Sequence, residues 1–306
     1  MGRRANRLTP FLFLLVVFSL PAKSTFAQEC RNFFEASFFQ SANVEAVAEC
    51  LDRGMKVNGR GENGETPLHW AAAYAEDVAI VDLLLRKGAD PNLKQEKGLL
   101  PIHMAAIFGS NPAAITSLVL AGTDVDEMYN AEKKYLPIPH TAGTTALMDA
   151  VKRPDATTIV AALLAAGADT EKVDRDGKTA LAGAAESARD SRIVKLLLAA
   201  GAKVNAKSDK GWRPIHFAAD NTDDVETVRA LLGAGADPDS TGPDNVTALM
   251  LAAANSINVE VFSVLLDNSE KPCAKDEFER SAIKLAEENN MIFCTKTYWK
   301  LLQICK

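Results

Sequence analysis

The residues best suited to chemistry in this 306-residue chain are four histidines and five cysteines. Histidine can act as a general acid or base near neutral pH, or it can bind a metal. Three of the four, His69, His103 and His216, stand two residues after a proline in the same short motif. Catalytic residues would not recur at one position of a repeated motif, so we expect a structural role for these three. His140 lies outside the motif.

Motifs for catalysis or cofactor binding are missing from the sequence. There is no His-Glu-x-x-His, no Gly-x-Ser-x-Gly, no phosphate-binding glycine loop and no Cys-x-x-Cys. The acidic residues are spread over turns and helix flanks, and no pair stands out as a general acid and base. We therefore predict a protein that is not an enzyme and needs no cofactor or metal. The weaker alternative is a metal-dependent enzyme built around His140 and nearby acidic residues.

The motif histidines belong to a repeated unit of two short helices, which is clearest between Thr66 and Asn92. Thr66 can cap the first helix, and Pro67 fits its first position, where no backbone N–H is needed. Gly88 supplies the positive φ angle that ends the second helix. The apolar stripe of the second helix consists of Val81, Leu84 and Leu85.

This unit recurs along the chain at a fixed spacing. The intervals are 34 residues, except for one of 45 that adds an insertion at about residues 126–140. A helix pair of this size buries only one layer against itself and needs copies on either side. The helix-ending glycine recurs as Gly88, Gly122, Gly167, Gly201 and Gly235. The start of the first helix recurs at Leu100, Thr145, Thr179, Arg213 and Thr247.

Six copies of a Thr-Pro-Leu-His-type motif at this spacing resemble the ankyrin repeat, which has that signature and a period of about 33 residues. The resemblance covers about three quarters of the chain. It implies an all-α ankyrin-repeat solenoid of stacked helix-turn-helix pairs with projecting turns, capped at both ends, with about six to seven repeats including both caps. It also implies that the three motif histidines hydrogen-bond to neighbouring turns.

The chain divides into four segments on this reading. Residues 1–27 form a signal peptide, 28–65 an N-terminal capping repeat, 66–270 the ankyrin repeats, and 271–306 the C-terminal capping helices. The first segment has a basic start, an apolar core of about ten residues and small residues before Gln28. Its apolar run is too short to span a membrane as an anchor. We therefore expect an exported protein, periplasmic or secreted, with no membrane insertion after the signal is cleaved.

Each cap has a sequence feature suited to closing the end of a stacked core. The second helix of the C-terminal cap should run roughly from 296 to 304, and Lys284 with residues 287–290 gives the preceding helix the polar face of a cap. In the N-terminal cap, a phenylalanine cluster should plug the open end of the core, with a binding patch as the alternative. The cluster consists of Phe33, Phe34, Phe38 and Phe39.

All five cysteines lie in the two caps, which in an exported protein suggests disulfides that clamp the ends. In an antiparallel helix pair, the start of the first helix faces the end of the second. Cys30 should therefore pair with Cys50, and Cys273 with Cys305. Cys294 would then be left over, and the alternative is a Cys294–Cys305 pair.

Partners of such solenoids usually dock on the concave side, which is built from the turn tips and the exposed ends of the first helices. Large apolar residues at these positions are expected to anchor a protein interface, although some could fold inward against Trp70 or Met104. They are Tyr74, Leu99, Ile107, Phe108 and Trp212. In the insertion, Tyr129 and Tyr135 are further candidates, with a variable loop that binds nothing as the alternative.

Composition narrows the class of partner. The formal net charge is −6, and no basic cluster interrupts the acidic balance, which argues against nucleic acid and anionic membranes as partners. We predict a monomeric, non-enzymatic, exported interaction module that binds another protein through its concave face. The alternative is an accessory protein, or an inhibitor or immunity protein, for a specific periplasmic enzyme or toxin.

Overall fold

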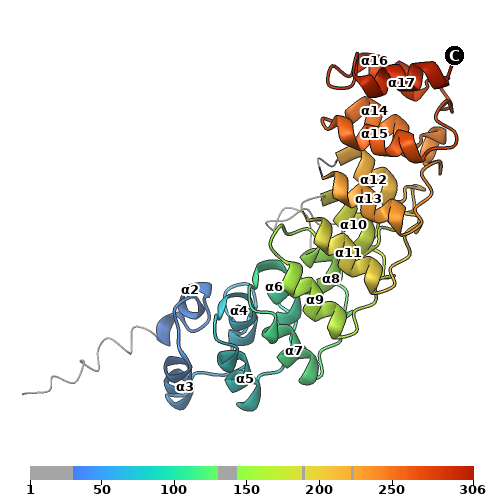
Figure 1. The fold of residues 1–306 in the computed structure, drawn as a ribbon. Helices are drawn as coiled ribbons and strands as arrows, with labels where there is room; N and C mark the ends of the chain where they lie inside the picture. Colours follow the sequence, from blue (N-terminus) through green and yellow to red (C-terminus); the bar gives the residue numbers. More distant parts are fainter. Residues whose placement is uncertain (1–29, 130–142, 188–189, 222–223) are drawn as a thin grey trace, which may run out of the picture.

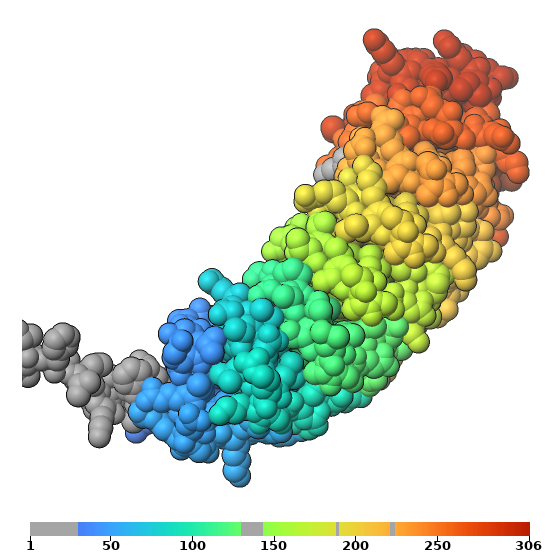
Figure 2. All heavy atoms as spheres, turned by 60° about the horizontal axis from the view of Figure 1, so that its bottom comes forward, coloured from blue at the N-terminus to red at the C-terminus, as the bar shows by residue number. Residues whose placement is uncertain are grey.

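A computed structural model describes residues 30–129, 143–187, 190–221 and 224–306. Within these residues the secondary structure is helical, with isolated β-bridges and no strands. The helices stack in pairs into one curved rod (Figure 1). The first helix of each pair lines the inner side of the curve, and the second helix forms the outer side. The space-filling view shows the same continuous, bent shape (Figure 2).

Eight helix pairs make up the described part of the rod. A short 3₁₀ helix, η1 (Cys30–Asn32), precedes the first pair. The first four pairs are α2 (Ala36–Phe39) with α3 (Val44–Asp52), α4 (Pro67–Tyr74) with α5 (Val78–Arg86), α6 (Pro101–Phe108) with α7 (Ala113–Leu120), and α8 (Ala146–Ala150) with α9 (Thr157–Ala165). The last four are α10 (Ala180–Ser187) with α11 (Ser191–Ala199), α12 (Pro214–Asn221) with α13 (Val225–Gly233), α14 (Ala248–Asn255) with α15 (Val259–Asn268), and α16 (Ala282–Glu288) with α17 (Lys296–Ile304).

The predicted all-α solenoid is therefore confirmed, but the predicted number of repeats is too low. About six to seven repeats were expected with both caps included, and the structure has eight helix pairs. The six copies of the motif each form one helix pair, and each cap adds a further pair, which makes eight. The second helix of the last pair, α17, spans Lys296–Ile304, as its apolar pattern predicted.

Local sequence explains where the helices begin and end. Thr66 is the N-cap residue of α4, with Pro67 in its first position. Asp77 caps α5, because its carboxylate accepts a hydrogen bond of 2.9 Å from the backbone N–H of Ala79. The five predicted helix-ending glycines have φ angles from 88° to 96°, a region that other residues rarely adopt. They are Gly88, Gly122, Gly167, Gly201 and Gly235.

The core runs along the whole rod as a long, narrow layer between the inner and outer helices. Ala71 and Ala105, on neighbouring inner helices, are fully buried, and their small side chains let the helices approach closely. Leu84 on the outer helix α5 is also fully buried. At the N-terminal end the predicted aromatic plug is confirmed for Phe33, Phe38 and Phe39, which are buried, and Phe34 is half-buried against them.

Two disulfide bonds clamp the ends of the rod. Cys30 is bonded to Cys50, and Cys273 to Cys305, which are the pairs that helix-pair geometry favours. Cys294 is a free, exposed thiol, so the alternative Cys294–Cys305 pair is not the one present. Across the described ranges, no helix has the length and apolar character needed to cross a membrane. The predicted signal peptide, residues 1–27, lies outside these ranges.

Candidate protein-binding surface

Three aromatic side chains form a continuous row on the inner helices of the N-terminal half. Trp70 and Tyr74 lie about one turn apart on α4, and their rings stack with centroids 6.1 Å apart. The ring of Tyr74 then meets that of Phe108 on α6 at 5.9 Å. All three side chains are half-buried, so each keeps part of its ring open to solvent. We call Trp70, Tyr74 and Phe108 the aromatic row.

The aromatic row rests on a small apolar cluster that is separate from the main core. The prediction that Leu99, Ile107 and Tyr129 are exposed anchors is wrong, because their exposed fractions are 0%, 4% and 3%. The turns fold back against the inner helices, so these side chains pack inward, as the alternative proposed. They are buried beneath Trp70, Tyr74 and Phe108, which pack against them. The buried members of the cluster are Ala73, Leu99, Met104, Ile107 and Tyr129.

Trp212 lies in the C-terminal half and does not join the aromatic row. Its half-buried ring packs on the main core and stands edge-on to His216, with centroids 5.3 Å apart. Gly242 of the next turn comes so close that an added Cβ would overlap the indole. Trp212 therefore fills the space between two successive turns, and only part of its ring remains accessible.

The three motif histidines link each inner helix to the following turn. In His69, Nδ1 accepts a hydrogen bond of 3.0 Å from the backbone N–H of Thr66, and Nε2 lies 3.0 Å from the carbonyl oxygen of Leu99. Since Nδ1 accepts, the proton of the neutral ring must sit on Nε2, which donates to that carbonyl. The predicted bonds to neighbouring turns are thus present for His69.

His103 and His216 repeat this arrangement. Their Nδ1 atoms accept from the N–H groups of Leu100 and Arg213, and their Nε2 atoms lie 2.8 Å from the oxygen of Glu127 and 3.0 Å from that of Ser240. Burial lowers the pKa of His216, like that of His69, to about 4, and it also lowers the pKa of His103. With both ring nitrogens bonded to backbone, these histidines act as structural staples.

Comparison with known proteins agrees with this architecture. A family model described as ankyrin repeats, in three copies, matches residues 102–208 and 215–297, and a single ankyrin repeat model matches residues 63–95. The chain belongs to the ankyrin repeat family. The crystal structure of the human ASB11 ankyrin repeat domain is 25% identical in sequence, with a TM-score of 0.63 over 80% of this chain and 98% of that one. No curated protein matches the chain.

Ankyrin repeats form elongated scaffolds that typically bind other proteins and are generally not enzymes. The fold therefore indicates a protein–protein interaction scaffold. Within the family architecture, binding specificity resides in side chains that differ between repeats, because the shared positions are occupied by capping and packing residues. The positions that vary along the inner helices are consequently the ones that matter for this chain.

The last residue of each eight-residue inner ankyrin helix is such a varying position. It is aromatic in the N-terminal half, where Tyr74 ends α4 and Phe108 ends α6. In the C-terminal half it is polar, with Ser187 at the end of α10 and Asn255 at the end of α14. Asn255 donates a hydrogen bond of 2.6 Å to the carboxylate of Asp220 on α12. The inner side therefore changes from aromatic to polar along the rod.

Polar pairing also covers the middle of the inner side. Lys178 forms an ion pair with Glu186 at 2.8 Å, and its ammonium group lies 4.6 Å from the centre of the Phe217 ring. Phe217 is only 9% exposed, and the Lys178 ammonium group over its ring helps to shield it from solvent. Sequence reasoning missed Phe217, and it treated Trp70 only as an inward-packing partner, although Trp70 is part of the aromatic row.

The insertion in the third ankyrin turn starts from a firmly anchored base. The N–H of Tyr129 donates to the oxygen of Thr144 at 3.1 Å, and the N–H of Gly143 donates to the oxygen of Tyr129 at 2.9 Å. The buried Tyr129 hydroxyl donates to the Asp149 carboxylate at 2.6 Å. Burial and the negative charge of Asp149 raise the pKa of Tyr129 far above its ordinary value. The candidates Tyr135 and His140 lie outside the described residues.

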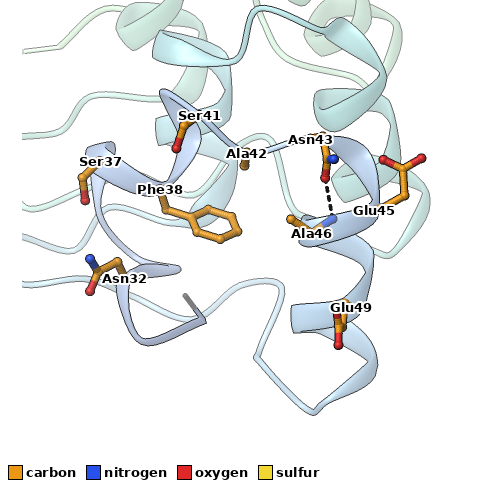
Figure 3. Close-up of a pocket in the computed structure, with 9 residues that line it drawn as sticks. All are labelled: Asn32, Ser37, Phe38, Ser41, Ala42, Asn43, Glu45, Ala46 and Glu49. Carbon is orange, nitrogen blue, oxygen red and sulfur yellow. Dashed lines mark hydrogen bonds between the residues drawn. The ribbon is translucent and has the colours of Figure 1, made fainter. Parts of the chain in front are cut away.

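A shallow hollow lies on the N-terminal ankyrin cap, between α2 and α3 (Figure 3). The ring of Phe38 forms part of its wall, and the other lining groups are mostly small or polar, among them Asn43, Glu45 and Glu49. Asn43 is occupied in capping α3, and Glu49 pairs with Arg53. Throughout the described ranges, no group of three or more His, Cys, Asp or Glu side chains could hold a metal ion. The aromatic row is therefore the better candidate site.

Proposed function

We propose that this ankyrin repeat protein is a non-enzymatic scaffold that binds another protein through the inner side of its N-terminal half, with Tyr74 and Phe108 as the anchoring side chains. The observation that carries the proposal is the aromatic row, in which half-exposed rings stand on a buried floor. Partly desolvated aromatic side chains of this kind contribute most of the binding free energy in many protein interfaces. Because the floor already orders the rings, binding costs little side-chain entropy.

The register of the helices supports a binding role over a folding role for these rings. Ser187 and Asn255 occupy the same helix position as Tyr74 and Phe108, and the repeats that contain them fold in the same way. An aromatic ring at this position is therefore not required to build the repeat. A solvent-facing row of such rings that the fold does not require is best explained by a partner.

The proposal is tested by affinity capture with mass spectrometry from the native periplasmic fraction. The Tyr74→Lys/Phe108→Lys double variant should lose the partner captured by the wild type, because each lysine places a charge against the partner's apolar surface. Asn255→Lys is the matched control, since it makes the same kind of change at the same register in the polar half. Helical circular dichroism must be equal in all three proteins. If the double variant captures the partner as well as the wild type does, the interface lies on another part of the rod.

We also propose that the chain is exported and works in an oxidising compartment. The two disulfide bonds at the ends of the rod support this, because such bonds persist mainly outside the cytoplasm. The expected signal segment at residues 1–27 is consistent with it. Intact-mass measurement of protein from the periplasmic fraction should give a chain that begins at Gln28. A full-length chain confined to the cytoplasm would disprove export.

In the affinity capture described above, recovery of one specific enzyme or toxin would favour the role of an accessory or inhibitor protein.

A further inference from the structure

Arg153 occupies the same position in its repeat as the two anchors of the aromatic row occupy in theirs. It stands eight residues after the N-cap residue of its inner helix, α8, as Tyr74 does in α4 and Phe108 in α6. Two aromatic residues are thus followed by an arginine in the next repeat. Tyr74 and Phe108 are half-buried, whereas the side chain of Arg153 is only 10% exposed. A guanidinium group withdrawn from solvent in this way needs hydrogen-bond partners inside the protein.

The guanidinium group of Arg153 binds the end of the preceding inner helix, α6. Its Nη1 atom donates to the carbonyl oxygen of Ala106 at 2.9 Å and to that of Gly109 at 2.8 Å. Its Nη2 atom makes a longer contact of 3.3 Å with the carboxylate of Asp155, which is 73% exposed. The last carbonyl groups of a helix have no partner within the helix, and a positive charge near them is favourable. Arg153 therefore gives the end of α6 both a hydrogen-bond donor and a positive charge.

The two carbonyl groups that Arg153 binds lie on either side of Phe108 in the chain. Phe108 is the last residue of α6, and Gly109 is its C-cap residue. Helix ends are among the parts of a protein where local opening costs the least free energy. A side chain from the next repeat thus fixes the backbone around Phe108 at the end of its helix. This holds the ring of Phe108 beside that of Tyr74.

The C-terminal half of the rod contains a similar bond that does not involve an arginine. Asn289 stands eight residues after the N-cap residue of α16, and its amide donates to the carbonyl oxygen of Ser256 at 3.0 Å. Ser256 is the C-cap residue of α14, as Gly109 is of α6. A small polar side chain is therefore enough to join two successive inner helices at this position. The buried guanidinium of Arg153, which binds a second carbonyl group, occurs where the preceding helix ends in Phe108.

We infer that Arg153 is a positioning residue for the aromatic row, because it fixes the end of α6 so that Phe108 is ordered before the partner binds. The role rests on the proposed function, since Arg153 acts on binding through Phe108. Its own side chain is nearly buried and offers the partner little contact surface. A ring that is already ordered loses less conformational entropy in the complex, so the effect of Arg153 appears in the affinity for the partner.

A double-mutant cycle tests the coupling between Arg153 and Phe108. The measured quantity is the dissociation constant for the purified partner that affinity capture identifies. Arg153→Met removes the donors and should weaken binding about threefold to tenfold, which corresponds to the entropy of ordering one side chain. Arg153→Lys keeps a charged donor and should lose less. In the Phe108→Ala background, Arg153→Met should cause no further loss, because the ring that Arg153 positions is absent.

Asn289→Ala is the matched control, because it removes the corresponding bond between inner helices in the C-terminal half. It should bind the partner like the wild type, although it also loses a bond between repeats. Hydrogen–deuterium exchange of the free chains gives an independent measurement. Arg153→Met should exchange faster at the end of α6, and Asn289→Ala at the end of α14. Helical circular dichroism at the temperature of the binding assay ensures that folded proteins are compared.

The outcomes for Arg153 and for the proposed function can be told apart. If Phe108→Ala binds the partner as tightly as the wild type, the proposed function fails. If Phe108→Ala weakens binding but Arg153→Met does not, the positioning role of Arg153 is overturned and the proposed function stands. An equal loss from Arg153→Met in both backgrounds would also overturn it, because Arg153 would then act independently of Phe108. Arg153→Asn, which copies Asn289, replaces Arg153→Met in the cycle if the latter unfolds.

Discussion

The histidine staples make the stability of the rod depend on pH. In the folded chain the pKa values of His69 and His216 are about 4, because burial of both rings disfavours their charged form. In the unfolded chain each returns to its ordinary value of 6.5. The unfolded state therefore binds more protons below pH 6.5. Stability from these groups is constant above pH 6.5 and falls as the pH drops from 6.5 towards 4.

The size of the effect follows from the two pKa values. Between pH 7 and pH 5, a histidine with a folded pKa of about 4 and an unfolded pKa of 6.5 loses about 2 kcal/mol of folding free energy, so His69 and His216 together lose about 4 kcal/mol. His103 acts in the same direction, since burial also lowers its pKa. Asp190 does not interfere, because its pKa, lowered mainly by a hydrogen bond from Arg192, is about 2 in the folded chain and 3.8 ordinarily, below this window.

The assay is urea unfolding followed by helical circular dichroism at pH 7 and at pH 5, with both disulfides intact. The comparison variant is His69→Met, which copies an arrangement the chain already uses. In two other repeats the third helical residue is Met148 or Met250, and its backbone N–H is capped by the hydroxyl of Thr145 or Thr247. Thr66 can provide the same cap in the His69→Met variant.

The His69→Met variant should lose about 2 kcal/mol less than the wild type between pH 7 and pH 5, whatever its stability at pH 7. The reasoning is refuted if the wild type is equally stable at both pH values. It is also refuted if the variant loses as much stability as the wild type, because the acid sensitivity would then arise from other groups.

Three further predictions concern the clamps and the core. Alkylation without reduction should label one thiol per chain, Cys294, and reduction of the disulfides should lower the melting temperature. Labelling of five thiols in exported protein would show that the two disulfides are not formed. Leu84→Ala should cost roughly 2–5 kcal/mol in a urea titration, whereas Leu120→Ala, at an exposed position, should cost little; equal losses would show that burial does not decide the effect. Tyr129→Phe removes a buried hydrogen bond to Asp149 and should cost about 1–3 kcal/mol; an unchanged urea midpoint would show that this bond contributes no stability.

Features that depend on neighbouring residues in the chain were predictable from the sequence. The proline and threonine at helix starts, and the glycines with positive φ at helix ends, act within a few residues, so the repeat and the all-α solenoid followed from their spacing. The bounds of α17 and the aromatic plug of the N-terminal cap were predicted for the same reason. The number of helix pairs was underestimated, since the six motif copies and the two capping pairs, all present in the sequence pattern, add up to eight.

Features that depend on how the turns fold over the helices were not predictable. Leu99 and Ile107 occupy positions that are exposed in many solenoids, but here the turn carrying Leu99 packs against α4 and buries both side chains beneath Tyr74 and Phe108. Nothing in the local sequence distinguishes Leu99, which lies below the surface, from Phe108, which reaches it. The turn that carries Leu99 is held against α4 by the bond between His69 and the Leu99 carbonyl, 30 residues apart, and only the assembled stack contains that contact.

Hydrogen–deuterium exchange of the chain, alone and with its captured partner, tests the binding surface most directly. Binding on the aromatic row should slow exchange in α4 and α6, around Trp70, Tyr74 and Phe108, and leave α14 and the outer helices unchanged. The change should vanish in the Tyr74→Lys/Phe108→Lys variant. Protection confined to the outer helices or to the polar inner face around Asn255, with α4 and α6 unaffected, would contradict the account.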